Sequence, residues 1–249
     1  MRRTRLLVAA GFAAFLVFLV AFLPATMLLR FVPAEVVLGG VSGTVWRGAA
    51  ASVSIKDTPL GSLRWSNRPW RLLLLQLQYR VVLQPAGGEL DMVATLGREG
   101  RLDISQLTGS FPVAAVYGLI APEGWTGTVE LDVEQLAVTA GFPVAASGLV
   151  RVRNLTSSSG PRPLNLGSFE LLLGEGAVGT ESISGRLRDL GGGPMKVRAT
   201  IELDRERRYL ISGEVAAGPD ADAAILRTLS FLGQADSLGR RPFSIEGTL

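Results

Sequence analysis

The sequence contains neither cysteine nor histidine. Without cysteine the chain has no disulfide, no thiolate nucleophile and no Cys-ligated metal. Without histidine it lacks the usual general base, proton shuttle and transition-metal ligand. Lysine is scarce too, since Lys56 and Lys196 are the only two, and neither stands in a Ser-x-x-Lys arrangement. Carboxylate pairs and hard-cation sites are the chemistry that these absences leave open.

Carboxylates two residues apart occur as Asp132 with Glu134 and as Glu202 with Asp204. On a strand this spacing places both members of a pair on one face, and the apolar residue between them marks that face as the solvated one. The glycine-rich segment 191–194 lacks the lysine and the following helix of a phosphate-binding loop. We therefore expect no enzyme activity, no cofactor and no metal.

A run of 24 residues without charge extends from Leu6 to Leu29. At about 1.5 Å rise per residue, a helix of this length spans a hydrocarbon layer of about 30 Å. Arg2, Arg3 and Arg5 precede the run, and basic flanks tend to stay in the cytoplasm. The pattern predicts a cytoplasmic stub, a transmembrane anchor and an exported domain, at residues 1–5, 6–29 and 31–249.

A long cleavable signal peptide and a buried core helix are the alternatives to an anchor. The apolar core of a signal peptide usually has about 7–15 residues and ends at a small-x-small site. The apolar stretch before Pro24 is already longer, and no clear cleavage pair follows it. The sequence favours an anchor and leaves its cleavage open.

The predicted exported domain is nearly neutral. Residues 1–30 hold four arginines and no acid, so residues 31–249 carry 21 basic and 22 acidic side chains. A nucleic-acid interface needs a clustered basic face. The one tight basic cluster, at 205–208, is interrupted by Glu206 and indicates a solvated turn. We expect no nucleic-acid partner.

Apolar and polar residues alternate through much of this domain. Lys196–Asp204 has the pattern of a half-buried strand, and Tyr209–Val215 pairs with it as a hairpin after a charged turn. Glycines and prolines punctuate the remaining segments at strand-and-turn spacing. We expect strands near Glu35–Val37, Gly43–Lys56, Leu60–Trp65, Leu73–Leu83, Gly88–Leu96, Arg101–Gly109, Thr126–Thr139, Ala146–Val152, Gly167–Leu173, Glu181–Leu190, Met195–Asp204, Tyr209–Val215 and Phe243–Leu249.

Two short helices complete the expected fold. Pro112 followed by Val113–Leu119 is typical of a helix with proline in its first turn. Asp220 or Asp222 is a suitable cap for a second helix that ends near Leu232. The predicted class is mainly β, with one transmembrane helix followed by an antiparallel β-meander that is a curved sheet or barrel-like. Glycine-led segments resemble each other in the two halves, and a subdivision near 140–147 is one option.

The most distinctive stretch is Val37–Ala50, which contains Gly-Thr-Val-Trp-Arg-Gly at 43–48. With Leu63–Ser66 and Arg68–Arg71 after it, the stretch resembles the N protein of the bacterial type II secretion system. The resemblance extends to the single N-terminal anchor, to Gly124–Gly127 and to the tail, and covers most of the chain. The tail residues are Leu232-Gly233 and Arg240–Leu249.

The resemblance implies an accessory, non-enzymatic subunit of a Gram-negative secretion apparatus. Such a protein is expected in the bacterial inner membrane as a single-pass protein, with its N-terminus cytoplasmic and residues 31–249 in the periplasm. It contacts the lipid bilayer through residues 6–29. Its periplasmic β domain docks on other secretion subunits, in the inner-membrane platform or the outer-membrane channel, during export of folded proteins. A homo-oligomer stays open, and the family supplies no catalytic residues to transfer.

The candidate interaction residues are the motif and three further tryptophans, namely Gly43, Thr44, Val45, Trp46, Arg47, Gly48, Trp65, Trp70 and Trp125. Trp46 is either a core residue or an exposed anchor. Trp70 is a candidate for a membrane-interface aromatic, a cover for a sheet edge or a partner anchor. Leu72–Leu75 cannot alternate between two faces, so this segment is buried on both faces, helical, or pressed against lipid or a partner.

A membrane-anchored lipid-handling protein is the alternative function. A curved β domain of this kind binds or transfers lipid by holding acyl chains in an apolar trough. Such a carrier exposes a continuous apolar groove well beyond the few hundred Å² of an ordinary soluble surface. An assembly subunit shows a closed core with a confined patch. The direction in which the apolar side chains point therefore separates the two functions.

Overall fold

The computed structural model describes residues 2–32, 35–67, 77–97, 100–119, 121–139, 141–158, 163–174 and 182–248. The candidate residue Trp70 and the leucine run 72–75 lie outside the described residues.

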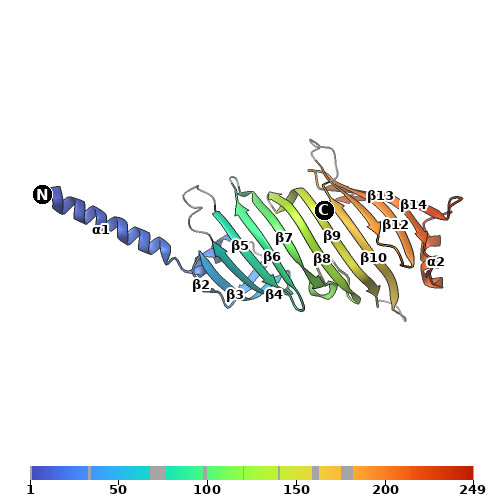
Figure 1. The fold of residues 1–249 in the computed structure, drawn as a ribbon, viewed down its shortest axis with the longest axis horizontal. Helices are drawn as coiled ribbons and strands as arrows, with labels where there is room; N and C mark the ends of the chain where they lie inside the picture. The colour runs from blue at the N-terminus through green and yellow to red at the C-terminus, as the bar shows by residue number, and fades with distance from the viewer. Residues whose placement is uncertain are drawn as a thin grey trace.

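One antiparallel sheet of 14 strands makes up the body of the protein (Figure 1). The order runs from β1 to β3 and then in sequence to β14, with β2 paired to β3 beside this path. This confirms the predicted meander. The strands are β1 (Val36–Gly39), β2 (Ser42–Gly43), β3 (Arg47–Ile55), β4 (Thr58–Asn67), β5 (Leu77–Gln84), β6 (Glu89–Leu96), β7 (Leu102–Pro112), β8 (Trp125–Thr139), β9 (Phe142–Ser157), β10 (Leu164–Leu173), β11 (Ile183–Asp189), β12 (Met195–Leu203), β13 (Arg208–Ala217) and β14 (Arg240–Thr248).

The sheet is open. Strands β1 and β14 end the strand order, and no described residue of one pairs with the other. In the region where a subdivision was an option, residues 141–147 hold a turn residue and the start of β9, the second strand of the β8–β9 hairpin. The ladder between these two strands continues from Trp125 to Thr139. The sheet therefore runs through that region without a change in strand order.

Register separates the two faces of the sheet. Directly paired residues on antiparallel strands place their side chains on the same face. One such line of pairs, the apolar row, holds only apolar residues and glycine from β3 to β14: Ala50, Leu63, Leu83, Leu90, Gly109, Leu131, Val150, Leu171, Leu187, Ala199, Gly213 and Phe243. On the opposite face a second line, the charged row, consists of Glu130, Arg151, Glu170, Arg188, Arg198 and Glu214.

Short helical elements cover parts of the apolar face. The 3-10 helix η4 (Val113–Val116) contacts β4, β7 and β8, and α2 (Ala223–Ser230) contacts β13. Buried residues gather in three clusters near η1, η4 and α2, around Trp65, Phe111 and Ile225 respectively. The core is therefore a series of separate clusters along one long sheet.

The second predicted helix is confirmed as α2. The Asp222 carboxylate accepts a hydrogen bond from the Ile225 N–H at 2.9 Å, so Asp222 is the N-cap. Ile225 and Leu229 are buried in the cluster beside β13. The first predicted helix, 113–119, is only the short 3-10 helix η4, because Tyr117 is extended and Gly118 has a positive φ of 79°.

The N-terminal helix α1 (Arg2–Ala21) leads away from one end of the sheet, and α2 and β14 lie at the other end (Figure 1). A 3-10 helix, η1 (Ala25–Phe31), follows α1. Ala25 and Leu28 pack in the same cluster as Trp65, so contact with the sheet begins inside the segment predicted as the anchor. As far as their residues are described, no helix here is long and apolar enough to cross a membrane.

Candidate interaction surfaces

Residues 43–48 form the joint between α1 and the sheet. The Trp46 Nε1–H donates a hydrogen bond of 2.8 Å to the carbonyl of Val20, in the last turn of α1. The Val45 N–H donates to the carbonyl of Leu23 at 2.9 Å. The last carbonyls of a helix have no partner within the helix. The motif therefore supplies bonds to the chain where α1 ends.

A tight turn gives the motif its shape. The Thr44 N–H donates to the Arg47 carbonyl at 2.8 Å, and the Arg47 N–H donates to Thr44 Oγ1 at 3.1 Å. Gly43 has a φ of 91°, and a Cβ there would lie 2.5 Å from the Arg47 carbonyl oxygen. Only glycine fits this position without a shift of the backbone.

Trp65 packs directly on the other glycine of the motif. A Cβ on Gly48 would lie 2.5 Å from Cζ2 of Trp65. The Trp65 Nε1–H donates to the Val45 carbonyl at 3.1 Å, and the side chain is buried in the first core cluster. The spacing between the motif and Trp65 is therefore set by packing across the β3–β4 pair.

The structure brings the motif and Trp65 together but places Trp125 elsewhere. Trp125 begins β8 and packs at the second core cluster, where its carbonyl accepts a hydrogen bond from the Tyr117 hydroxyl. Trp46 and Trp125 are half-buried and Trp65 is buried. These three tryptophans are built into the fold, and their role toward a partner stays a prediction.

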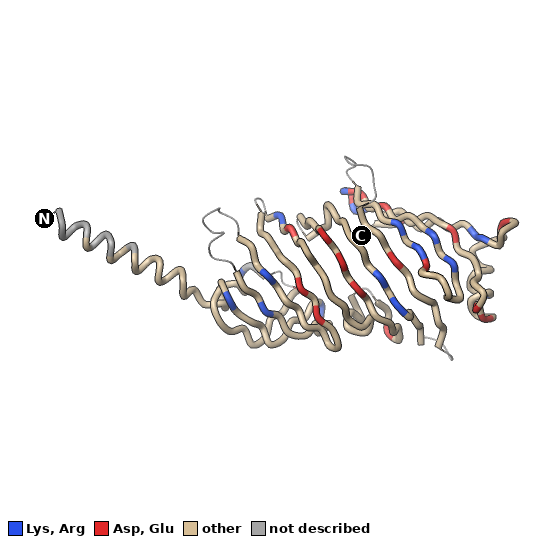
Figure 2. Tube along the Cα trace, in the orientation of Figure 1, with Lys and Arg blue, Asp and Glu red and all other residues tan. Residues whose placement is uncertain are grey.

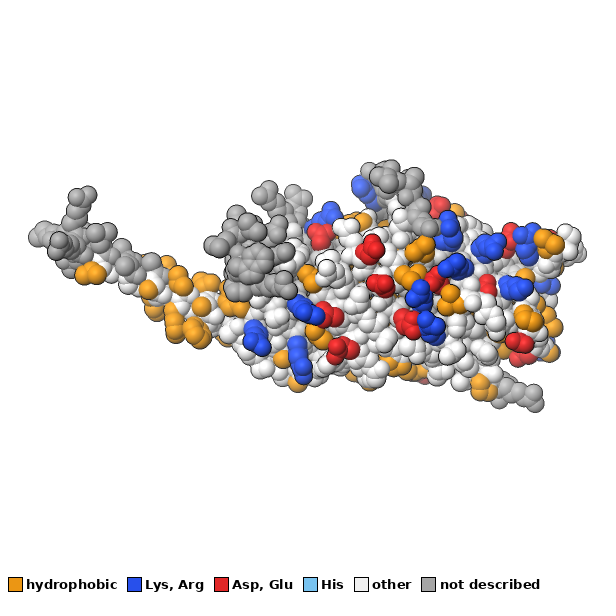
Figure 3. Space-filling view, viewed as in Figure 1, with side chains coloured by type: hydrophobic (Ala, Val, Ile, Leu, Met, Phe, Trp, Pro, Cys, Tyr) orange, Lys and Arg blue, Asp and Glu red, His pale blue; other side chains and the backbone are white. Residues whose placement is uncertain are grey.

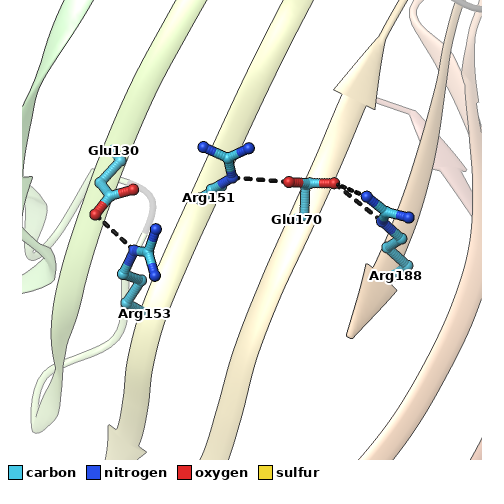
Figure 4. Close-up of polar contacts among 5 residues, drawn as sticks. All are labelled: Glu130, Arg151, Arg153, Glu170 and Arg188. Carbon is cyan, nitrogen blue, oxygen red and sulfur yellow. Dashed lines mark hydrogen bonds and ion pairs between the residues drawn. The ribbon is translucent and has the colours of Figure 1, made fainter. Parts of the chain in front are cut away.

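Glu170 is the centre of the charged row (Figure 4). Its side chain is 6% exposed and accepts hydrogen bonds from Arg151 Nε at 2.7 Å and from Arg188 Nε at 2.9 Å. These bonds, the one from Arg151 most of all, hold the pKa of the Glu170 carboxyl below its ordinary value, against the opposing effect of burial. In the same row Glu130 pairs with Arg153 at 2.6 Å. The row therefore ties β8 to β11 on the polar face.

A groove of about 740 Å³ on this face has an excess of basic side chains. Strands β11, β12 and β14 contribute its basic residues, and Asp189 and Glu214 are its acidic ones. Figure 3 shows basic side chains gathered over the C-terminal strands. Among the described residues, Lys196 and Arg198 form no ion pair or side-chain hydrogen bond. The basic lining residues are Arg186, Arg188, Lys196, Arg198 and Arg240.

The groove contains a pairing that sheet stability does not explain. Arg188 and Arg198 are directly opposite in the β11–β12 register, and like charges in that arrangement are destabilising. The charge of Arg188 is compensated by an ion pair with Glu170. Arg198 has Glu214 opposite it on β13, but Glu214 pairs with Arg240 at 2.9 Å. The arrangement suits the binding of an anionic surface.

Of the two carboxylate pairs singled out in the sequence, the first is exposed as expected. Asp132 and Glu134 are exposed and Val133 between them is 5% exposed. In the second, Glu202 is exposed but Asp204 is half-buried after the end of β12, where it pairs with Arg208. Among the described residues no three Asp, Glu, His or Cys side chains come together as a metal site would require.

The charged row and the basic groove were not found by sequence reasoning. Their members are spread over the sequence from 130 to 240 and meet only through strand register (Figure 2). The available signal was the polar position of each member in an alternating strand, which marks the solvated face but not the neighbours across it.

Comparison with known proteins identifies relatives. Residues 34–244 match the family model described as type II secretion system (T2SS), protein N. The curated type II secretion system protein N of Aeromonas hydrophila is 29% identical over 259 residues, which covers 99% of this chain and 100% of that protein. No solved structure is significantly similar to the chain.

Replacing Trp46 by phenylalanine tests the joint. Phenylalanine keeps an aromatic side chain but has no N–H, so the bond to the Val20 carbonyl is lost. We expect a loss of about 1 kcal/mol of stability and faster amide hydrogen exchange around the Val45 N–H, which bonds the Leu23 carbonyl. Trp125→Phe is the matched control, and it should leave exchange in this segment unchanged. Equal exchange in the Trp46→Phe variant and the unmodified protein would show that the indole does not hold the joint.

Glu170→Gln tests the charged row. A carboxyl whose pKa is lowered by folding stabilises the protein above its unfolded pKa, and this stabilisation is lost as pH falls through the folded pKa. We expect Glu170→Gln to lower the free energy of unfolding by about 1–3 kcal/mol near neutral pH. As pH falls below the ordinary pKa of glutamate, the urea midpoint should decrease less in this variant than in the unmodified protein. Glu130→Gln, at an exposed pair, is the control. A decline as steep in Glu170→Gln as in the unmodified protein would contradict this account.

Proposed function

The chain belongs to the type II secretion system protein N family, and from this membership we propose that it is an accessory, non-enzymatic subunit that docks on other subunits of the apparatus. Membership makes it a subunit of a type II secretion system, which works at the cell envelope and is assembled from several proteins. The observation that carries the proposal is the family match over residues 34–244.

We propose that residues 6–29 anchor the protein in the inner membrane, with the N-terminus cytoplasmic and the sheet in the periplasm. The proposal rests on the length of the uncharged run, which continues past the end of α1, and on the arginines before it. Large apolar side chains along α1 support it, since Phe12, Val17 and Phe18 are each more than 60% exposed. Water alone is an unfavourable environment for such a surface.

The basic groove is the proposed docking surface for another subunit. Lys196 and Arg198 lie there without ionic partners among the described residues, and charge complementarity steers association. The expected partner is an acidic surface of a neighbouring subunit, because its charge is complementary to that of the groove.

Lipid handling stays the second candidate, because one specific observation favours it. The apolar row runs from β3 to β14, and the elements η4 and α2 that cover parts of it contact β4, β7, β8 and β13. Between them Leu171 and Leu187 are half-buried and belong to none of the three buried clusters. An acyl chain bound here would cover apolar surface that the protein itself covers only partly.

Single cysteines test the topology, since the chain has none of its own. We expect Ser237→Cys, at an exposed turn between α2 and β14, to react with a membrane-impermeant maleimide in cells whose outer membrane is permeabilised. Thr4→Cys should react only after the inner membrane is lysed. Labelling of Thr4→Cys before lysis would contradict a cytoplasmic N-terminus.

Photocrosslinking in living cells separates the two functions. A photoreactive amino acid at Lys196 should capture another secretion subunit, and one at Leu187 on the apolar row should capture no lipid. Lys56, the other lysine, lies in an exposed turn between β3 and β4 and serves as the control position. Lipid adducts at Leu187 with no protein captured at Lys196 would favour the lipid-handling function.

A further inference from the structure

Strand β14 ends the sheet on the side away from α1 (Figure 1). It pairs with β13 along one edge, from Arg240 to Thr248. No described residue pairs with its other edge. A free edge presents backbone N–H and C=O groups that another strand can bond.

Two pairs of hydrogen bonds fix which residues point to this free edge. The backbone of Arg208, the first residue of β13, bonds Asp204 on the β12 side, so even-numbered residues of β13 face β12. Because backbone groups alternate along a strand, the odd-numbered residues face β14. At the start of β14 the Arg240 N–H and C=O both bond Asp236 and not β13. Both observations direct the even-numbered residues of β14 outward.

The outward set is Pro242, Ser244, Glu246 and Thr248. Pro242 has a carbonyl but no N–H to offer, and the turn at Asp236 occupies Arg240, so the first part of the edge is protected. The second part has no such protection. Ile245 in this part is 52% exposed on the apolar face, next to the half-buried Phe243.

We propose that two copies of this protein pair through β14, with the two Ser244 residues opposite each other on a two-fold axis. In this antiparallel register the Ser244 N–H of each copy donates to the Ser244 carbonyl of the other. The Glu246 N–H of each copy donates to the Pro242 carbonyl of the other. Proline can accept this bond although it has no N–H of its own. Because Pro242 has no N–H, the one bond lost at this pair is the bond that would run from residue 242 to the Glu246 carbonyl of the second copy.

The same register makes the side chains complementary. On the apolar face, Phe243 lies opposite Ile245 of the second copy, and such aromatic and β-branched pairs stabilise a sheet. On the polar face, Arg240 lies diagonal to Glu246 of the second copy, within reach for an ion pair. A two-fold interface must match itself. In this register both the backbone hydrogen bonds and the side-chain pairs of β14 are self-complementary. This favours a second copy over an unrelated strand.

The apolar surface near this edge is larger than the strand itself. Leu226, Phe231 and Leu238, in α2 and the chain between α2 and β14, are 50%, 84% and 71% exposed. They lie at the same end of the molecule as β14 (Figure 1). A second copy at this end supplies apolar surface to cover them.

Disulfide formation at Ser244 tests the register. Opposed residues at a hydrogen-bonded position have Cα atoms about 5.5 Å apart, which is within the range that a disulfide bridges. We expect the full-length Ser244→Cys protein in detergent to form a covalent dimer on mild oxidation. Ser212→Cys is the matched control, because Ser212 pairs with Ser244 one strand further in. Two copies of it would be about 14 Å apart and should not be linked.

A second variant measures the pairing without a crosslink. Ser244→Pro removes an outward N–H and leaves the bonds to β13 in place, so we expect the protein to remain folded and its mass by light scattering to fall from dimer to monomer. Ser244→Ala should remain dimeric. A monomeric unmodified protein, or efficient linking of Ser212→Cys, would overturn the proposal. So would capture of a different protein by Ser244→Cys in cells in place of a second copy. None of these outcomes depends on the secretion role.

Discussion

The structure depends on one constraint, which is that every strand keeps the register that aligns the apolar row. A shift of one residue in any strand would turn its apolar side chains to the charged face. Small residues at two points of the row make the alignment tight. A Cβ on Gly213 would lie 2.5 Å from the Ala199 Cβ, and one on Gly109 would collide with the Glu89 carbonyl. These positions leave no room for a side chain between neighbouring strands.

The same register assembles the polar face. Glu170 receives Arg151 from one neighbouring strand and Arg188 from the other, so a carboxylate that is almost buried is satisfied by two cations whose side chains are more exposed. Such burial is tolerated because the charge is hydrogen-bonded on both sides. Beyond β11 the balance changes, since Arg198 and Lys196 have no ionic partner among the described residues. The polar face thus changes from internally paired in the middle to positively charged near β14.

The long open sheet explains why the two ends of the protein differ. At one end Trp46 of the motif bonds the Val20 carbonyl in the last turn of α1. There β2 pairs with β3, and η1 packs in the first core cluster. At the other end β14 has an edge whose second half is unprotected. The functional surfaces proposed for this family member, a groove and an edge, both belong to that second end. They are separated from the proposed anchor by the length of the sheet.

Alternation of apolar and polar residues by itself determined the mainly β class, the positions of most strands and the solvated faces of Asp132 and Glu134, because these depend on neighbours along one strand. A capping aspartate predicted α2, because a helix cap is also a local signal. Only the tertiary structure decided that Trp46 bonds α1 while Trp65 packs on Gly48. It also decided that Glu170 meets two arginines and that the helix predicted over 113–119 is only the 3-10 helix Val113–Val116. These outcomes depend on register and on contacts between distant segments, and the periodicity of a single strand carries no information about which strand lies beside it.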